Sequence, residues 1–286
     1  MSLSSGTLPA GLFEASRYCL GLSDPGAKCA AVVELGVACD EGRLRFDPEC
    51  PVLPIGPPGR PAKPLLVHAS RLSRRRLGNP QGRAALVHAI AHIEFNAINL
   101  ALDAVYRFRG MPPAYYRDWL SVAVDEARHF RLLEARLGTL GKTYGDLPAH
   151  DGLWEMAEKT ANDCLARMAL VPRVLEARGL DVTPGMIAKL MAAGDTETVA
   201  VLRIILDEEV RHVAIGSHWF SHCCRARGVD PVKTFLFLLR THYGGAVRGP
   251  FNLEARYEAG FSPEEMDALA ALQERALRTK SEPAVS

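Results

Sequence analysis

The residues best suited to metal chemistry occur in a short pattern that the chain contains twice. The pattern reads acid, Glu, any residue, Arg, His, and its copies span residues 125–129 (DEARH) and 208–212 (EEVRH). On an α-helix, residues i and i+3 point in similar directions. Glu126 and His129 therefore share one helix face, as do Glu209 and His212, and each pair can bind one divalent ion.

Two further glutamates are predicted ligands because of their spacing from the repeat. Glu94 precedes Glu126 by 32 residues, and the midpoint is Gly110, which lies in a predicted turn. Folding the two helices into a hairpin therefore brings Glu94 level with Glu126. Glu176 precedes Glu209 by 33 residues, but a turn, a short helix and a second turn are expected between them. The match is looser, and Glu176 is the least secure of the six ligands.

Four carboxylates and two imidazoles form a set suited to two metal ions. Two divalent cations about 3.5–4 Å apart need anionic oxygens that bridge them, and imidazole adds a neutral donor to each. The inward positions around Glu94 are apolar (Ala91, Ala97, Ile98 and Ala101), and a glutamate buried there without a partner is costly. One Glu-x-x-His pattern is commonly just a solvated helix face, but two copies in one framework rarely arise by chance. We predict two iron ions, with manganese or a mixed pair as the alternative.

Charged residues beside the ligands are expected to support the site. An acidic residue next to a ligand points about 100° away on its own helix, so it would accept a hydrogen bond from a ligand His on a neighbouring helix. The candidates for this role are Asp125, Asp207 and Glu208. Arg128 and Arg211 recur with the pattern and are expected to pair with these carboxylates.

Other residues that could do chemistry are predicted to have structural roles. His88 and His92 do not share the direction of Glu94, so structural or surface positions are expected for both. The predicted turn near Gly110 has three tyrosines close by, for which core packing is favoured over a redox role: Tyr106, Tyr115 and Tyr116.

Four long helical patterns would position the six ligands. Apolar residues recur with helical period over residues 82–108, 113–137, 153–178 and 196–227. Pro172 should kink the third helix, Gly179 to Asp181 should end it, and a short helix is expected over 184–193. No segment alternates with a period of two, so no sheet is predicted. The chain is expected to be an all-α, ferritin-like four-helix bundle.

The flanking segments add helices to this bundle. Residues 8–41 predict a helical hairpin that turns at Ser23 to Gly26, and seven prolines between residues 47 and 64 predict an extended connector. A helix is expected over 231–242, with a tail after Pro263. Three segments result: 1–79 (hairpin and connector), 80–228 (bundle) and 229–286 (C-terminal helical extension packed on the bundle).

Composition excludes several classes of protein. Of 286 residues 48% are hydrophobic, and the net charge of +1 provides no general attraction for nucleic acid or anionic lipid. Seven cysteines without a CxxC pair argue against a disulfide framework or a thiolate zinc site. With no signal-like start and no uncharged apolar run of about eighteen residues, we expect a soluble cytoplasmic protein with no membrane partner. The basic run at 71–76 (RLSRRR) is expected to be solvated, with an RNA contact as the alternative.

Several segments resemble known families. Residues 92–97 (HIEFNA), 125–129 and 178–181 (RGLD) resemble an uncharacterised family of bacterial ferritin-like proteins, itself loosely similar to MiaE-type tRNA hydroxylases. Both acid-Glu-x-Arg-His copies are also similar to those of bacterial multicomponent di-iron hydroxylases. The resemblance covers roughly residues 80–225, and it implies the same six residues as metal ligands.

The leading hypothesis is an oxygen-activating di-iron oxidoreductase of the monooxygenase or hydroxylase type. Its partners would be molecular oxygen, a substrate and an electron donor that the sequence does not identify, and its state a monomer or small homo-oligomer. A tRNA substrate is a variant that rests on the basic run and distant kinship. Two alternatives stay open: a ferroxidase or metal-storage protein, and a non-catalytic helical scaffold stabilised by metal.

Overall fold

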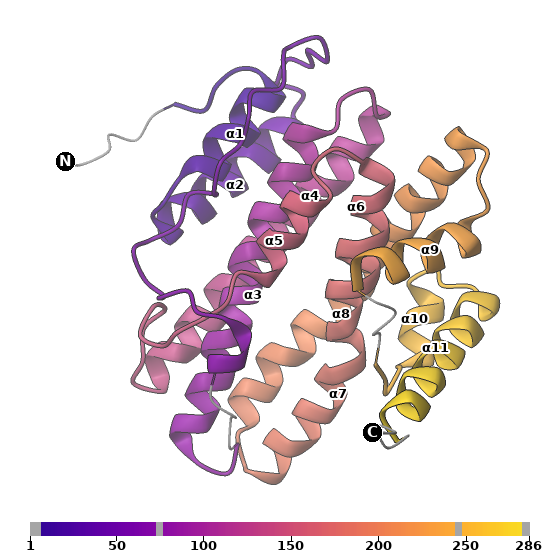
Figure 1. Cartoon of the computed structure of the whole chain (residues 1–286). Coiled ribbons are helices and arrows are strands. Elements are labelled where there is room, and N and C mark those ends of the chain that lie inside the picture. The colour runs from indigo at the N-terminus through magenta and orange to yellow at the C-terminus, as the bar shows by residue number, and fades with distance from the viewer. Residues whose placement is uncertain (1–6, 73–76, 244–247, 282–286) are drawn as a thin grey trace. The chain divides into compact units, whose positions relative to one another are not determined.

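The computed structural model describes residues 7–72, 77–243 and 248–281, and within them the chain is all-α (Figure 1). These residues contain no strand and only two isolated β-bridges, Gly11 with Arg45 and Leu66 with Ala149. The all-α prediction is therefore confirmed. Residues 73–76, which carry most of the predicted basic run, lie outside the described residues.

By their internal contacts, the residues divide into two compact units. The first unit comprises Met1–Glu155 and Ala193–Val201, and the second comprises Met156–Ala192 and Leu202–Ser286. Helix α8 (Thr196–Arg227) begins in the first unit and ends in the second. The boundary between the units falls inside the segment 80–228, so the three-part division by sequence stays a prediction.

The first unit begins with the predicted helical hairpin. Helices α1 (Leu12–Gly21) and α2 (Pro25–Asp40) are joined at Asp24, whose side chain accepts a hydrogen bond from the Ala27 N–H (2.7 Å). This N-cap and the proline after it start α2 as the sequence indicated. Helix α1 packs on α3 and α2 packs on α4. The Pro-rich connector follows without regular helix until the short 3-10 turn η1 (Ala69–Arg71).

Helices α3 (Pro80–Arg107) and α4 (Pro113–Thr139) form the core of the first unit and pack along each other. Asn79 caps α3 by accepting from the Gly82 N–H (2.7 Å), and Gly110 takes the positive φ (76°) that the turn requires. The predicted hairpin is confirmed. Helix α3 is long and apolar enough to cross a membrane, but 83% of its most apolar window is buried inside the protein, as expected for a core helix.

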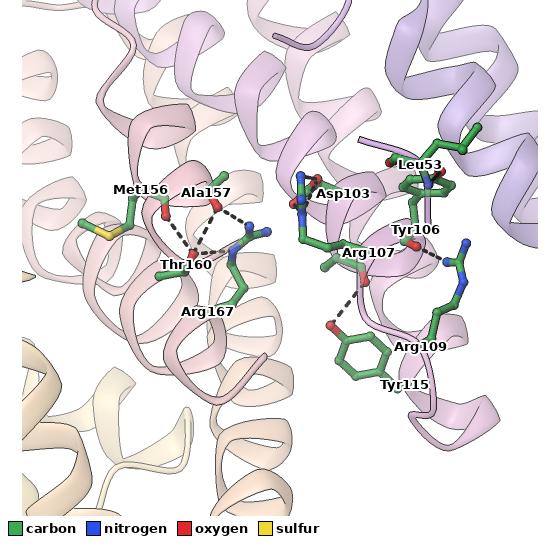
Figure 2. A network of polar contacts seen from close by, with 11 residues as sticks. Leu53, Asp103, Tyr106, Arg107, Arg109, Tyr115, Met156, Ala157, Thr160 and Arg167 are labelled. Carbon is green, nitrogen blue, oxygen red and sulfur yellow. Dashed lines mark hydrogen bonds and ion pairs between the residues drawn. The ribbon is translucent and has the colours of Figure 1, made fainter. Parts of the chain in front are cut away.

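The structure interrupts the helix that was predicted over residues 153–178. Residues 153–178 form α5 (Gly152–Lys159), a break, α6 (Cys164–Leu170) and a π-helical segment η2 (Val171–Glu176). At the break, buried Arg167 donates to the Thr160 hydroxyl (2.7 Å) and the Ala157 carbonyl (2.5 Å), as Figure 2 shows. These bonds satisfy the end of α5 and stabilise the interruption.

The predicted stop at Gly179 to Asp181 is also wrong. Helix α7 (Ala177–Ala192) continues through these residues and through Pro184. The short helix expected over 184–193 is therefore part of α7. A proline deprives the carbonyl four residues earlier of its helical partner. Here that carbonyl belongs to Leu180 and accepts from the Asn252 side chain (3.3 Å), so the helix tolerates the proline.

The rest of the second unit is formed by α9 (Pro231–Tyr243), α10 (Leu253–Glu258) and α11 (Pro263–Ser281). Buried ion pairs tie α10 and α11 to the third-helix region: Arg256 with Asp181 (2.7 Å) and Arg173 with Glu265 (2.8 Å). The pairs satisfy charges that would be costly to bury alone.

Candidate metal centre

Three predicted ligands lie together in the first unit. Glu94 on α3 and Glu126 and His129 on α4 are almost fully buried, with exposed fractions of 3%, 0% and 0%. The His129 Nδ1 lies 3.3 Å from Glu94 Oε2 and 3.5 Å from Glu126 Oε2. Each residue offers one ligand atom within 4.8 Å of the others. The turn at Gly110 thus brings Glu94 to the Glu-x-x-His pair as predicted, and this buried acidic and histidine group could hold a metal ion.

The electrostatics of this group favour a cation between its side chains. Burial alone would lower the pKa of His129, but its interactions with the Glu126 and Glu94 carboxylates outweigh burial and raise the pKa to about 11. Two buried carboxylates thus draw positive charge to the Nδ1 position. A metal ion there would replace the proton with a larger charge, and the imidazole would bind it in its neutral form.

The second copy of the pattern forms a similar pair in the second unit. His212 is fully buried, and its Nδ1 lies 3.6 Å from Glu209 Oε1. The Glu209 side chain is 12% exposed. Both histidines therefore present Nδ1 to the glutamate three residues earlier on the same helix.

Contacts within the second unit fix the register of Glu176 against α8. A Cβ placed on Gly216 would lie 2.3 Å from Pro172 Cβ, so the two backbones approach closely there. Arg173 Nε donates to the Ser217 hydroxyl at the next position (3.2 Å). The two segments run in opposite directions, since Asp163 also contacts Arg227. We therefore expect half-buried Glu176, four residues after Pro172, near the level of His212, four residues before Gly216. The spacing argument had placed it level with Glu209, one turn away.

The charged neighbours of the ligands lie at more exposed positions. Arg128 pairs with Asp125 (3.3 Å), and their side chains are 45% and 22% exposed. Glu208 is half-buried, while Asp207 and Arg211 are exposed. Support of the ligands by these residues stays a prediction.

The sequence reasoning missed a cluster of two buried histidines and half-buried Tyr144. His92 Nε2 lies 3.2 Å from the His150 carbonyl, and its Nδ1 lies 2.9 Å from the Tyr144 hydroxyl. The Asn96 side-chain amide nitrogen, one turn further along α3, lies 3.0 Å from the same Nε2. The same loop binds His88, which accepts from the Gly145 N–H (2.9 Å). Both histidines were expected to be either structural or at the surface. Both are buried, which agrees with a structural position.

The three tyrosines near the first turn bind backbone groups. Tyr106 accepts from the Leu53 N–H (2.8 Å) and so fastens the Pro-rich connector to α3 (Figure 2). Tyr115 and Tyr116 donate to the carbonyls of Ala104 (3.4 Å) and Phe108 (3.0 Å). These contacts agree with the structural role predicted for them.

Comparison with known proteins shows the family of this chain. An uncharacterized protein of Haemophilus influenzae is 49% identical over 214 residues, which cover 72% of this chain and 74% of the relative. No solved structure matches the chain. The model of one family, described as "Protein of unknown function (DUF455)", matches residues 22–267. This match spans most of the sequence, and the chain therefore belongs to the DUF455 family.

Proposed function

We propose that this protein holds a dinuclear metal centre inside a ferritin-like four-helix bundle. The observation that carries the proposal is the buried trio Glu94, Glu126 and His129, whose carboxylates surround one imidazole nitrogen. The second unit would add three more ligands: Glu176, Glu209 and His212. Each unit would contribute one glutamate and one Glu-x-x-His pair, which are the ligands of one ion. Together the six ligands match the set described for di-iron and di-manganese carboxylate proteins.

The donor atoms are compatible with iron or manganese. Carboxylate oxygens and imidazole nitrogens suit these ions, whereas zinc or copper(I) sites of the thiolate type require cysteine. Four carboxylates would offset the four positive charges of two divalent ions. In both copies of the pattern Nδ1 faces the neighbouring glutamate, so one ion can bind the imidazole and the carboxylate of the same helix.

We further propose that the activity is oxygen-dependent oxidation, of the hydroxylase type. Two bound ferrous ions would supply electrons for the reduction of molecular oxygen, and an external donor would restore them. The chain's own part is to bind and orient the ions and to keep bulk water away. Buried apolar side chains flank the ligands of the first unit, among them Ile98, Val122 and Phe130. His129 would release its proton as the metal binds.

Oxygen uptake by the ferrous protein tests this function. After anaerobic loading with ferrous iron and removal of the excess, wild-type protein should consume oxygen at a rate well above that of free iron. Glu126→Gln should lose this uptake because a buried carboxylate ligand is gone. Glu134→Gln is the matched control, since Glu134 lies on the same helix but pairs with Arg131 at the surface. Equal uptake by all three proteins would overturn the proposal.

A further inference from the structure

Two cysteines of the second unit lie side by side although 59 residues separate them in the sequence. Cys164 is the first residue of α6, and Cys223 lies in the C-terminal part of α8. The Cys164 side chain is near enough to Cys223 to lower the pKa of the Cys223 thiol. Cys223 is 7% exposed and Cys164 is half-buried, so the pair is partly exposed to solvent.

An ion pair holds the two cysteine positions together. Arg227 donates to both carboxylate oxygens of Asp163, with distances of 2.6 and 3.0 Å. Asp163 directly precedes Cys164, and Arg227 lies one helical turn after Cys223 on the same face of α8. The two-point contact therefore fixes the start of α6 against the face of α8 that carries Cys223.

The surroundings make Cys223 the more reactive thiol. The nearby Cys164 side chain and the charge of Arg227 lower the pKa of Cys223 despite its burial. Burial instead raises the pKa of Cys224 to about 11, and likewise that of Cys29. Because the thiolate is the nucleophile, oxidation should begin at Cys223 and spare Cys224 and Cys29.

We propose that Cys164 and Cys223 form a reversible disulfide in response to hydrogen peroxide. The Cys223 thiolate attacks one peroxide oxygen, the O–O bond breaks, and a sulfenic acid and one water result after proton transfer. The Cys164 thiol then attacks the sulfenic sulfur, forms the S–S bond and releases a second water. Two thiols are oxidised by two electrons and one peroxide is reduced. A dithiol reductant reverses the step.

The disulfide would link the two helical segments that lead to the ligands of the second unit. Cys164 precedes Glu176 by twelve residues, and Cys223 follows His212 by eleven, which is about three helical turns on each side. The bond would lock α6 to α8 at a point remote from the ligands. It requires no bound metal, so its test is independent of the proposed function.

Thiol counting and peptide mapping on the full-length, metal-free protein test the inference. After brief treatment with hydrogen peroxide, thiols titrated under denaturing conditions should fall from seven to five per chain. A non-reducing tryptic digest should join peptide 160–167 (TANDCLAR) to peptide 212–225 (HVAIGSHWFSHCCR). Dithiothreitol should restore seven thiols and separate the peptides.

Three serine variants decide which thiols react. Cys164→Ser and Cys223→Ser should each abolish the linked peptide, whereas Cys224→Ser, at the adjacent buried position, should retain it. Circular dichroism before treatment shows whether each variant is folded. The digest of the wild-type protein tests the inference even if a variant does not fold. A bond between Cys223 and Cys224, overoxidation of Cys223 with Cys164 still free to be alkylated, or seven unchanged thiols would each overturn the inference.

Discussion

Replacing Gly216 with alanine should destabilise the protein through its contact with the π-helical segment. A Cβ at residue 216 would lie 2.3 Å from both Cβ and Cγ of Pro172. Neither side can yield easily, because the proline ring is rigid and both residues lie within helical segments. Overpacking of this kind costs about 1–3 kcal/mol, and so close a contact belongs at the upper end.

The helix propensity of alanine offsets part of this cost. Alanine is favoured over glycine inside a helix by about 1 kcal/mol, which leaves a net loss of about 2 kcal/mol. For a protein of this size the melting temperature should fall by roughly 4–8 °C, from about 2–4 °C per kcal/mol. Differential scanning calorimetry of the metal-free protein measures this change without any contribution from bound ions.

Gly179→Ala provides the matched control. Gly179 also lies in a helix of the second unit, and a Cβ there would meet nothing within 4 Å. This variant should be as stable as wild type or gain up to about 1 kcal/mol. The close approach of α8 to the π-helical segment, and with it the register given to Glu176, would be refuted if Gly216→Ala melted at or above the wild-type temperature.

Two further predictions concern the first unit. Lys28 is fully buried, and burial lowers its pKa from an ordinary value near 10.5 to about 7. Between about pH 7 and 10.5 the unfolded chain holds a proton on Lys28 that the folded chain lacks. The free energy of unfolding of wild type, relative to Lys28→Met, should therefore rise with pH over this window, by a few kcal/mol in total. Urea unfolding of both proteins at pH 6, 8 and 10 measures the sign of this change. Tyr144→Phe removes the hydrogen bond to His92 and should cost about 1 kcal/mol in the same assay, while an unchanged midpoint would show that this bond contributes nothing.

Local signals in the sequence were sufficient to predict the helices of the first unit. Capping residues and prolines mark the starts of α2 and α3, and Gly110 marks the turn between α3 and α4. The ligand trio of this unit follows from the same signals, because a short turn between two regular helices leaves one register. Both Glu-x-x-His pairs required only helical periodicity.

Tertiary contacts decided the features that the sequence did not predict. The break before α6 depends on the buried side chain of Arg167, and the passage of α7 through Pro184 depends on Asn252, sixty-eight residues later in the chain. No local pattern encodes either partner. Tyr144 was missed for a similar reason, since it lies in a loop and meets His92 only after the chain has folded.

The ratio of metal to protein in ligand variants tests the central claim most directly. After anaerobic loading with ferrous iron and desalting, elemental analysis of wild type should find two ions per chain. His129→Asn removes a ligand from one unit and His212→Asn from the other, so each variant should retain at most one. One ion or fewer in wild type, or two ions in either variant, would contradict the proposed dinuclear centre.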